Sequence, residues 1–119
     1  MENLTINKFN VNNNNITTIH KNAFKNCELE FIYMAYNKIS FDSDDNQNLS
    51  PFRNCKKLKD LELAYNNISK IYDDWRKIDT LDRLNLFNNS IKYVEVSNNN
   101  KVRILFCRKK VKNFVFRLV

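Results

Sequence analysis

Residues 58–68, LKDLELAYNNI, and residues 81–91, LDRLNLFNNSI, share one pattern, LxxLxLxxNxI. Two looser copies precede them in the chain. The nearer copy consists of Leu29, Ile32, Met34, Asn37 and Ile39, and the farther one of Ile6, Phe9, Val11, Asn14 and Ile16. The copies start at residues 6, 29, 58 and 81, so the chain repeats itself at a spacing of 23 or 29 residues. A repeat of this length indicates a solenoid, in which each unit stacks on the next.

The pattern is the signature of leucine-rich repeats. It predicts an α/β fold, a right-handed β-α superhelix of about four repeats in residues 1–100, with a short parallel sheet on its concave face. The LxL leucines alternate inward along each strand, and the residues between them face the concave surface. Apolar residues of the second half of each unit are expected to fill the interior. They are Ile19, Phe24, Phe52, Ile71, Trp75 and Ile78.

The asparagines of the motif follow the strand, where the chain turns. We expect their side-chain amides to bond backbone groups of the neighbouring unit and so form a structural ladder. The ladder residues are Asn14, Asn37, Asn66 and Asn89. The chain has 22 asparagines and no glycine, so asparagine is also expected to make the tight turns that need a left-handed backbone.

The composition excludes several kinds of catalytic or binding site. Glycine-rich phosphate loops, dinucleotide fingerprints and nucleophile elbows all need glycine. His20 is the single histidine, so we predict no enzyme and no catalytic residue. The acidic stretch 42–48 fails as a calcium loop, because Gln47 and Arg53 stand where an EF-hand needs glycine and glutamate. We therefore expect no metal site and no cofactor.

The formal net charge of +7 lies in one part of the chain. Residues 1–100 hold 13 basic and 13 acidic side chains, and residues 101–119 add seven basic ones and no acid. The repeats are therefore neutral overall, and we expect no nucleic-acid partner for them. The N-terminal sequence lacks the pattern of a signal peptide, and no stretch approaches the length of a membrane span.

Cys27 and Cys55 each end an FxNC element, at residues 24–27 and 52–55, just before the next strand. The favoured interpretation is that both are buried, unpaired thiols that pack as small hydrophobes. A disulfide between the two adjacent units is the alternative. Three cysteines, with Cys107, are too few and too scattered for a disulfide-rich scaffold or a CxxC metal site.

The long unit NLSPFRNCKKL at 48–58, the FxNC element and IYDDWR at 71–76 resemble the extracellular repeats of insect Toll receptors. The resemblance covers roughly residues 4–96. It implies a fragment of an innate-immune or developmental receptor ectodomain, extracellular or on a membrane receptor. Its protein ligand would be a cystine-knot cytokine of the Spätzle kind, and a cytoplasmic TIR domain would carry the signal.

Acceptor sequences for N-linked glycans support a secretory origin. They occur at Asn3, Asn15, Asn67 and Asn88, and also at Asn48, where Pro51 weakens the site. Asparagine richness alone would generate about two such sequences, so chance is a second interpretation. The alternative function is an intracellular or secreted repeat adaptor or decoy that mediates protein-protein interaction without signalling of its own.

Aromatic and charged residues between the inward leucines form the candidate ligand-binding surface. They are Phe31, Tyr33, Tyr36, Asp60, Glu62, Tyr65, Arg83, Asn85 and Phe87. Tyr and Arg carry much of the energy at protein interfaces. Stacking of Tyr36 and Tyr65 on neighbouring units is the purely structural alternative. The partner would be a protein ligand or another repeat protein, and uncapped solenoid ends predict self-association.

The segment 101–119 lacks the LxxLxLxxN pattern and is predicted to be a basic, non-repeat tail. Its alternating Val111, Phe114, Phe116 and Leu118 predict an edge strand over the open end of the solenoid. Binding to anionic lipid or nucleic acid, and an abnormal end of a truncated reading frame, are the other interpretations.

Overall fold

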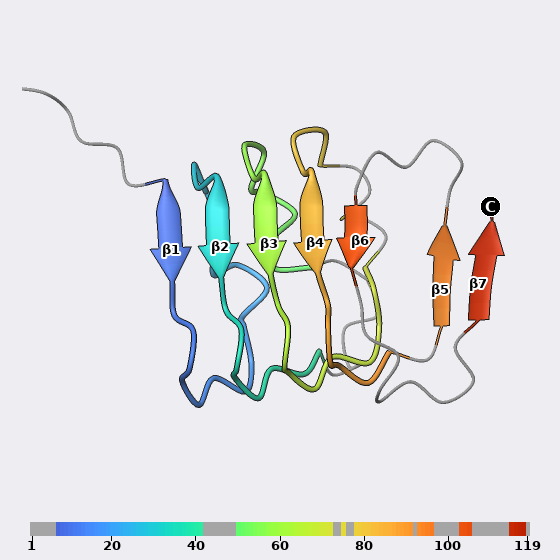
Figure 1. The fold of residues 1–119 in the computed structure, drawn as a ribbon. Coiled ribbons are helices and arrows are strands. Elements are labelled where there is room, and N and C mark those ends of the chain that lie inside the picture. The colour runs from blue at the N-terminus through green and yellow to red at the C-terminus, as the bar shows by residue number, and fades with distance from the viewer. Residues whose placement is uncertain are drawn as a thin grey trace, which may run out of the picture.

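The computed structural model describes residues 7–41, 50–72, 75 and 78–91, together with the backbone of three strands in residues 93–118. The main sheet is parallel and has the order β1-β2-β3-β4-β6 (Figure 1). Its strands are β1 (Lys8–Asn10), β2 (Phe31–Tyr33), β3 (Asp60–Glu62), β4 (Arg83–Asn85) and β6 (Arg103–Leu105). A second, two-stranded parallel sheet pairs β5 (Tyr93–Val96) with β7 (Val115–Leu118).

Each repeat contributes one strand of the main sheet at the same point of its sequence. We refer to the stretches that begin at residues 6, 29, 58 and 81 as the first to fourth units. The middle residues of their strands are register partners: Phe9 pairs with Ile32, Ile32 with Leu61 and Leu61 with Leu84. In β2, β3 and β4 the middle residue is fully buried and both neighbours are half-buried. The alternation therefore follows the motif, with leucine-type positions inward.

The main sheet extends one strand beyond the four predicted repeats. Ile104 of β6 is the register partner of Leu84, although residues 101–119 were predicted to be a tail without repeats. By this register Lys101 and Lys109 stand where the motif has its first leucine and its asparagine. A search for the full motif therefore misses the strand, because backbone pairing needs only a short extended segment. Val115–Leu118 is a strand as the alternation suggested, but it pairs with β5 and not with the main sheet.

The core runs through the stacked units as one column of side chains. The LxL leucines form one wall, and Phe52, Trp75 and Ile78 from the return half of the units form the other, all of them buried as predicted. Ring contacts link successive units, with centroids 5.3 Å apart between Phe24 and Phe52 and 6.5 Å apart between Phe52 and Trp75. Ile19, Phe24 and Ile71 pack against this core while remaining partly exposed.

The motif asparagines of the second, third and fourth units tie each of these units to the one before it, whereas the predicted ladder residue Asn14 donates only to Val11 and Asn12 of its own unit. The Nδ2 of Asn66 donates to the carbonyls of Leu63 in its own unit and Met34 in the preceding unit, both at 3.0 Å. Its Oδ1 accepts from the backbone N–H of Ile39 at 2.9 Å. Asn37 and Asn89 repeat this arrangement, reaching back to Val11 and Leu63 respectively. Each amide thus satisfies backbone groups that the turn leaves without a strand partner.

The residue before each motif asparagine has a left-handed backbone. Its φ is 61° at Asn13, 57° at Tyr36, 55° at Tyr65 and 57° at Asn88. The expectation that asparagine makes these turns is therefore wrong in the second and third units, where tyrosine does so. A bulky residue pays about 1–2 kcal/mol for this conformation, so a compensating contact is needed.

The described return segments, where the α/β repeat was expected to place its helices, are turns at residues 21–26, 51–54 and 79–80, with a 3₁₀ residue at Trp75. Within the part of the chain that the structure describes there is no α-helix.

Candidate functional site

The half-buried positions of β2, β3 and β4 place six predicted ligand-binding residues on one face of the sheet. We call this the solvent face of the sheet, and its residues are Phe31, Tyr33, Asp60, Glu62, Arg83 and Asn85. The strands that carry them are adjacent and in register, so the side chains stand in rows across the units. The structure thus assembles residues that are more than fifty positions apart in sequence.

Arg83 organises the charged part of this face. Its guanidinium donates from Nη1 to Asp60 Oδ1 at 2.9 Å and from Nη2 to Glu62 Oε2 at 3.0 Å. Partial burial works against the charged guanidinium, but the hydrogen bonds to Asp60 and Glu62 outweigh it and raise the pKa of Arg83. Asn85 Nδ2 donates to the same Glu62 oxygen at 3.0 Å. The network is therefore preorganised, and its carboxylates are held in fixed positions.

A stack of aromatic rings lies where the strands end. The rings of Tyr36 and Tyr65 are 4.3 Å apart and inclined by only 8°, and Phe87 continues the row at 5.4 Å from Tyr65. Tyr36 is 51% exposed, so one end of the stack faces solvent. Its hydroxyl pKa is raised, by desolvation first and then by the hydroxyl of Tyr65. Stacking of this kind stabilises by about 0.5–1.5 kcal/mol and so offsets part of the backbone cost of the two tyrosines.

Phe87 reaches the stack from a different position in the repeat. By register it matches Ala64, and Asn88 takes the left-handed position that belongs to Tyr65 in the third unit. The aromatic row continues into the fourth unit, while the left-handed turn there falls to asparagine. Phe87 therefore adjoins Tyr65 in space, although the two residues hold different positions in the repeat.

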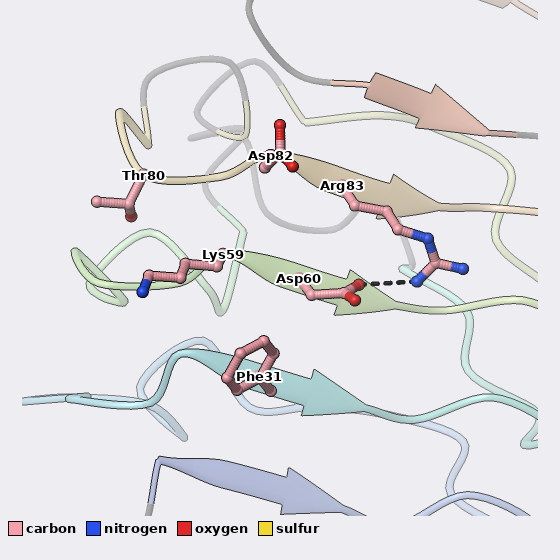
Figure 2. Close-up of a pocket in the computed structure, with 6 residues that line it drawn as sticks. All are labelled: Phe31, Lys59, Asp60, Thr80, Asp82 and Arg83. Atoms are coloured by element: carbon pink, nitrogen blue, oxygen red, sulfur yellow. Dashed lines mark hydrogen bonds and ion pairs between the residues drawn. The ribbon is translucent and has the colours of Figure 1, made fainter.

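An open groove of about 420 Å³ begins at the N-terminal ends of the strands (Figure 2). It is lined by Phe31, Lys59, Asp60, Thr80, Asp82 and Arg83. Phe31, Asp60 and Arg83 come from β2, β3 and β4 in turn, and Figure 2 shows the ion pair of Asp60 and Arg83 at the side of the groove. Lys59, Thr80 and Asp82 were not predicted as surface residues. The signal was available, since Lys59 and Asp82 occupy the first variable position of LxxLxL.

The two aromatic residues of the solvent face lie on β2, beside the first unit. The ring of Phe31 lies 6.5 Å from that of Tyr33, and the ammonium of Lys8 lies over the Tyr33 ring at 5.5 Å. The predicted surface thus divides into a charged network on β3 and β4, an aromatic pair on β2 and the stack at the strand ends. All nine predicted residues lie within these three groups.

The predicted glycan acceptors differ in their surroundings. Asn15 and Asn67 are exposed, whereas Asn3 and Asn48 lie outside the described residues. The Oδ1 of Asn88 is buried and has no hydrogen-bond partner among the described residues, and its backbone φ is 57°. Asn88 as a whole is half-buried, so it is less accessible than the two exposed acceptors. Among the acceptors that the structure describes, Asn15 and Asn67 are the exposed ones.

Neither a metal centre nor a membrane-spanning helix is found in the described part of the chain. No three His, Cys, Asp or Glu side chains there are grouped to hold a metal ion. No described helix has the length and apolarity to cross a bilayer. His20 lies in a turn, where its Nδ1 accepts from the backbone N–H of Asn22 at 3.1 Å.

The fold is that of a leucine-rich-repeat solenoid, which confirms the predicted fold class. A solved structure of an internalin from Listeria monocytogenes matches this chain with a TM-score of 0.61 and 22% sequence identity. The match covers 95% of this chain and 30% of the internalin chain, so the chain spans less than a third of that protein. No family model matches the sequence. No curated protein matches it either. The structural likeness establishes the fold.

Proposed function

We propose that this chain is a protein-recognition module that binds its partner through the solvent face of the sheet and the adjoining aromatic stack. The observation that carries the proposal is the stack of Tyr36, Tyr65 and Phe87. Two of its residues hold left-handed backbones, and its outer ring is half exposed. Strained backbone that persists at an exposed position is typical of functional sites. Tyrosine and arginine are enriched at binding hot spots, and here the exposed Tyr36 and the half-buried Tyr65 adjoin the face that carries Arg83.

A photo-crosslinking experiment tests this function directly. A photoreactive phenylalanine analogue replaces Tyr36 or Phe31 in the full chain, and the matched control carries it at Lys25, which is exposed in the return turn. The proposal predicts one crosslinked protein shared by positions 36 and 31 and absent at position 25. A partner captured equally from position 25, or no partner from any position, overturns it.

The more specific proposal is a fragment of a Toll-type receptor ectodomain in the secretory pathway. It rests on the sequence resemblance and on exposed acceptors at Asn15 and Asn67. The probe is a purified cystine-knot cytokine of the Spätzle kind. We expect Tyr36→Asn, which keeps a residue tolerant of the left-handed backbone, to weaken its binding about tenfold or more, while Lys25→Ser leaves it unchanged. Failure of the unaltered chain to bind removes the receptor assignment and leaves the recognition module standing.

The second candidate is an adaptor or decoy without signalling of its own. The zero net charge of residues 1–100 favours it, and so does the internalin match, which supports the fold alone. Reading the native transcript past both ends of this sequence separates the two. A secretion signal upstream and a membrane span with a TIR domain downstream support the receptor fragment. A transcript with none of these supports the adaptor or decoy.

A further inference from the structure

The two FxNC turns of the first and second units lie against each other. Arg53 of the second turn donates to the backbone carbonyl of Lys21 at 2.6 Å and to Asn22 Oδ1 at 3.2 Å in the first. The rings of Phe24 and Phe52 are 5.3 Å apart and inclined by 30°. Lys57 and Glu28, which follow the two turns, form an ion pair at 2.7 Å. These contacts hold the turns together on both sides of their cysteines.

Cys27 and Cys55 meet inside this contact. Both are free thiols, and they lie close enough for Cys27 to contribute, after burial, to the raised pKa of Cys55. Cys55 is fully buried, whereas Cys27 is partly exposed. A disulfide needs its two cysteines close together with their side chains facing, and the contacts between the two turns bring these two segments together before any bond forms.

We propose that Cys27 and Cys55 are a covalent cross-link site, at which a disulfide staples the first unit to the second. The partner chemistry is thiol-disulfide exchange with a small-molecule disulfide such as oxidised glutathione. This proposal does not depend on the ligand or on the receptor assignment.

The different surroundings of the two thiols fix the order of the exchange. Burial, and then the neighbouring Cys27, raise the pKa of the Cys55 thiol, so Cys55 stays protonated. Cys27 is the accessible thiol, and its thiolate attacks one sulfur of oxidised glutathione and releases a glutathione thiolate. The Cys55 thiol then gives its proton to solvent, attacks the Cys27 sulfur and releases the second glutathione. The protein dithiol loses two electrons, and one oxidised glutathione becomes two reduced ones.

The cross-link would act on the least buried unit. All three residues of β1 are exposed, and Phe9, the register partner of the fully buried Ile32, is 38% exposed. Fixing the first FxNC turn to the second limits separation of the first unit from the rest of the stack. The expected consequence is slower hydrogen exchange at amides that join the first two units, such as those of Val11 and Asn13.

The test uses the full chain with Cys107→Ser, so that Cys27 and Cys55 are the remaining thiols. After equilibration with mixtures of oxidised and reduced glutathione, free thiols are alkylated and the protein is digested with trypsin without reduction. We expect a linked pair of peptides, residues 26–38 with residues 54–56. A stable glutathione adduct at Cys27 without this link, or dimers joined through Cys27, overturns the proposal.

A matched control moves one thiol out of contact. Adding Cys27→Ser and Lys25→Cys keeps two thiols but places the first on an exposed side chain of the same turn, so no internal link is expected. A second measurement needs no further substitution, because it compares the same protein in its folded and unfolded states. The same equilibrium is measured in concentrated urea, and the folded chain should favour the disulfide about tenfold or more over the unfolded chain. An equal or lower preference in the folded chain overturns the proposal.

Discussion

Asn14 in the first unit and Asn66 in the third hold the same place in the repeat, but their surroundings differ. Asn66 is buried, and its amide bonds the backbones of two units. Asn14 is exposed, and the hydrogen bonds that its side chain donates, to Val11 and Asn12, stay inside its own unit. The strand residues Phe9 and Leu61 differ in the same way, at 38% and 0% exposed. The motif therefore sets where the asparagine and the strand residue stand in the repeat. Their burial, and so their contribution to stability, depends on a preceding unit that covers them.

The largest effect should separate two phenylalanines of these regions. Phe52→Ala empties a fully buried site between Phe24 and Trp75 and should lower the free energy of unfolding by about 4 kcal/mol. Phe9→Ala removes a partly exposed ring and should cost about 1 kcal/mol. Urea unfolding followed by tryptophan fluorescence measures both, since Trp75 is buried in the core. Equal losses would show that the first unit is as well packed as the second.

The ladder asparagines give the next contrast. Asn66→Ala leaves the buried amide of Ile39 without its partner and removes one of the two side-chain donors of the Met34 carbonyl, so it should lower the free energy of unfolding by about 3 kcal/mol. Asn14→Ala lets water replace the lost bonds and should change it by less than about 0.5 kcal/mol. The same urea titrations apply. A large loss at Asn14 would mean that something covers its outer side.

A smaller effect tests the left-handed tyrosine. Both Tyr65→Ala and Tyr65→Gly remove the ring from the stack, but glycine alone also removes the backbone strain at φ 55°. The glycine variant should therefore be more stable than the alanine variant by about 1 kcal/mol. A difference of similar sign is expected between Asn13→Gly and Asn13→Ala in the first unit. If the two variants are equally stable, the backbone at residue 65 is not strained, and the aromatic stack has no backbone cost to offset.

The smallest contrast concerns two ion pairs. Arg83→Gln breaks a guanidinium that bonds two carboxylates and should lower the free energy of unfolding by less than about 1 kcal/mol at low salt. Lys57→Gln breaks a pair in which both side chains are about two-thirds exposed, and we expect no measurable change. Thermal melts at two salt concentrations compare them. A measurable loss of stability in Lys57→Gln would mean that the Lys57–Glu28 pair between the FxNC turns stabilises the fold more than exposed ion pairs normally do.

The sequence predicts the repeating part of this molecule well because each motif position has one physical role. Inward leucines and outward polar residues follow from alternation, and the burial of Phe52 and Trp75 follows from their place after the strand. The fifth main-sheet strand was missed because Lys101 and Lys109 break the motif while the backbone still pairs. The left-handed tyrosines could not be predicted, since residue type alone favours asparagine there and the stack that offsets the strain is formed only between units. Lys59 and Asp82 line the groove from the first variable position of LxxLxL, which lies before the strand whose alternation predicts the exposed face.

Each ladder asparagine bonds backbone groups that are synthesised before it, so the order of translation affects when each unit is completed. Each carbonyl that follows a strand accepts one bond from the asparagine of its own unit and a second from the next unit. The second bond comes to Val11 from Asn37, 26 residues later, to Met34 from Asn66, 32 residues later, and to Leu63 from Asn89, 26 residues later. A newly synthesised unit therefore lacks its inter-unit hydrogen bonds until the strand and the asparagine of the next unit have been synthesised. At ordinary elongation rates of about 5–20 residues per second, each unit spends roughly one to several seconds in this state. Slow codons within a unit would prolong the exposure of the unit that precedes it.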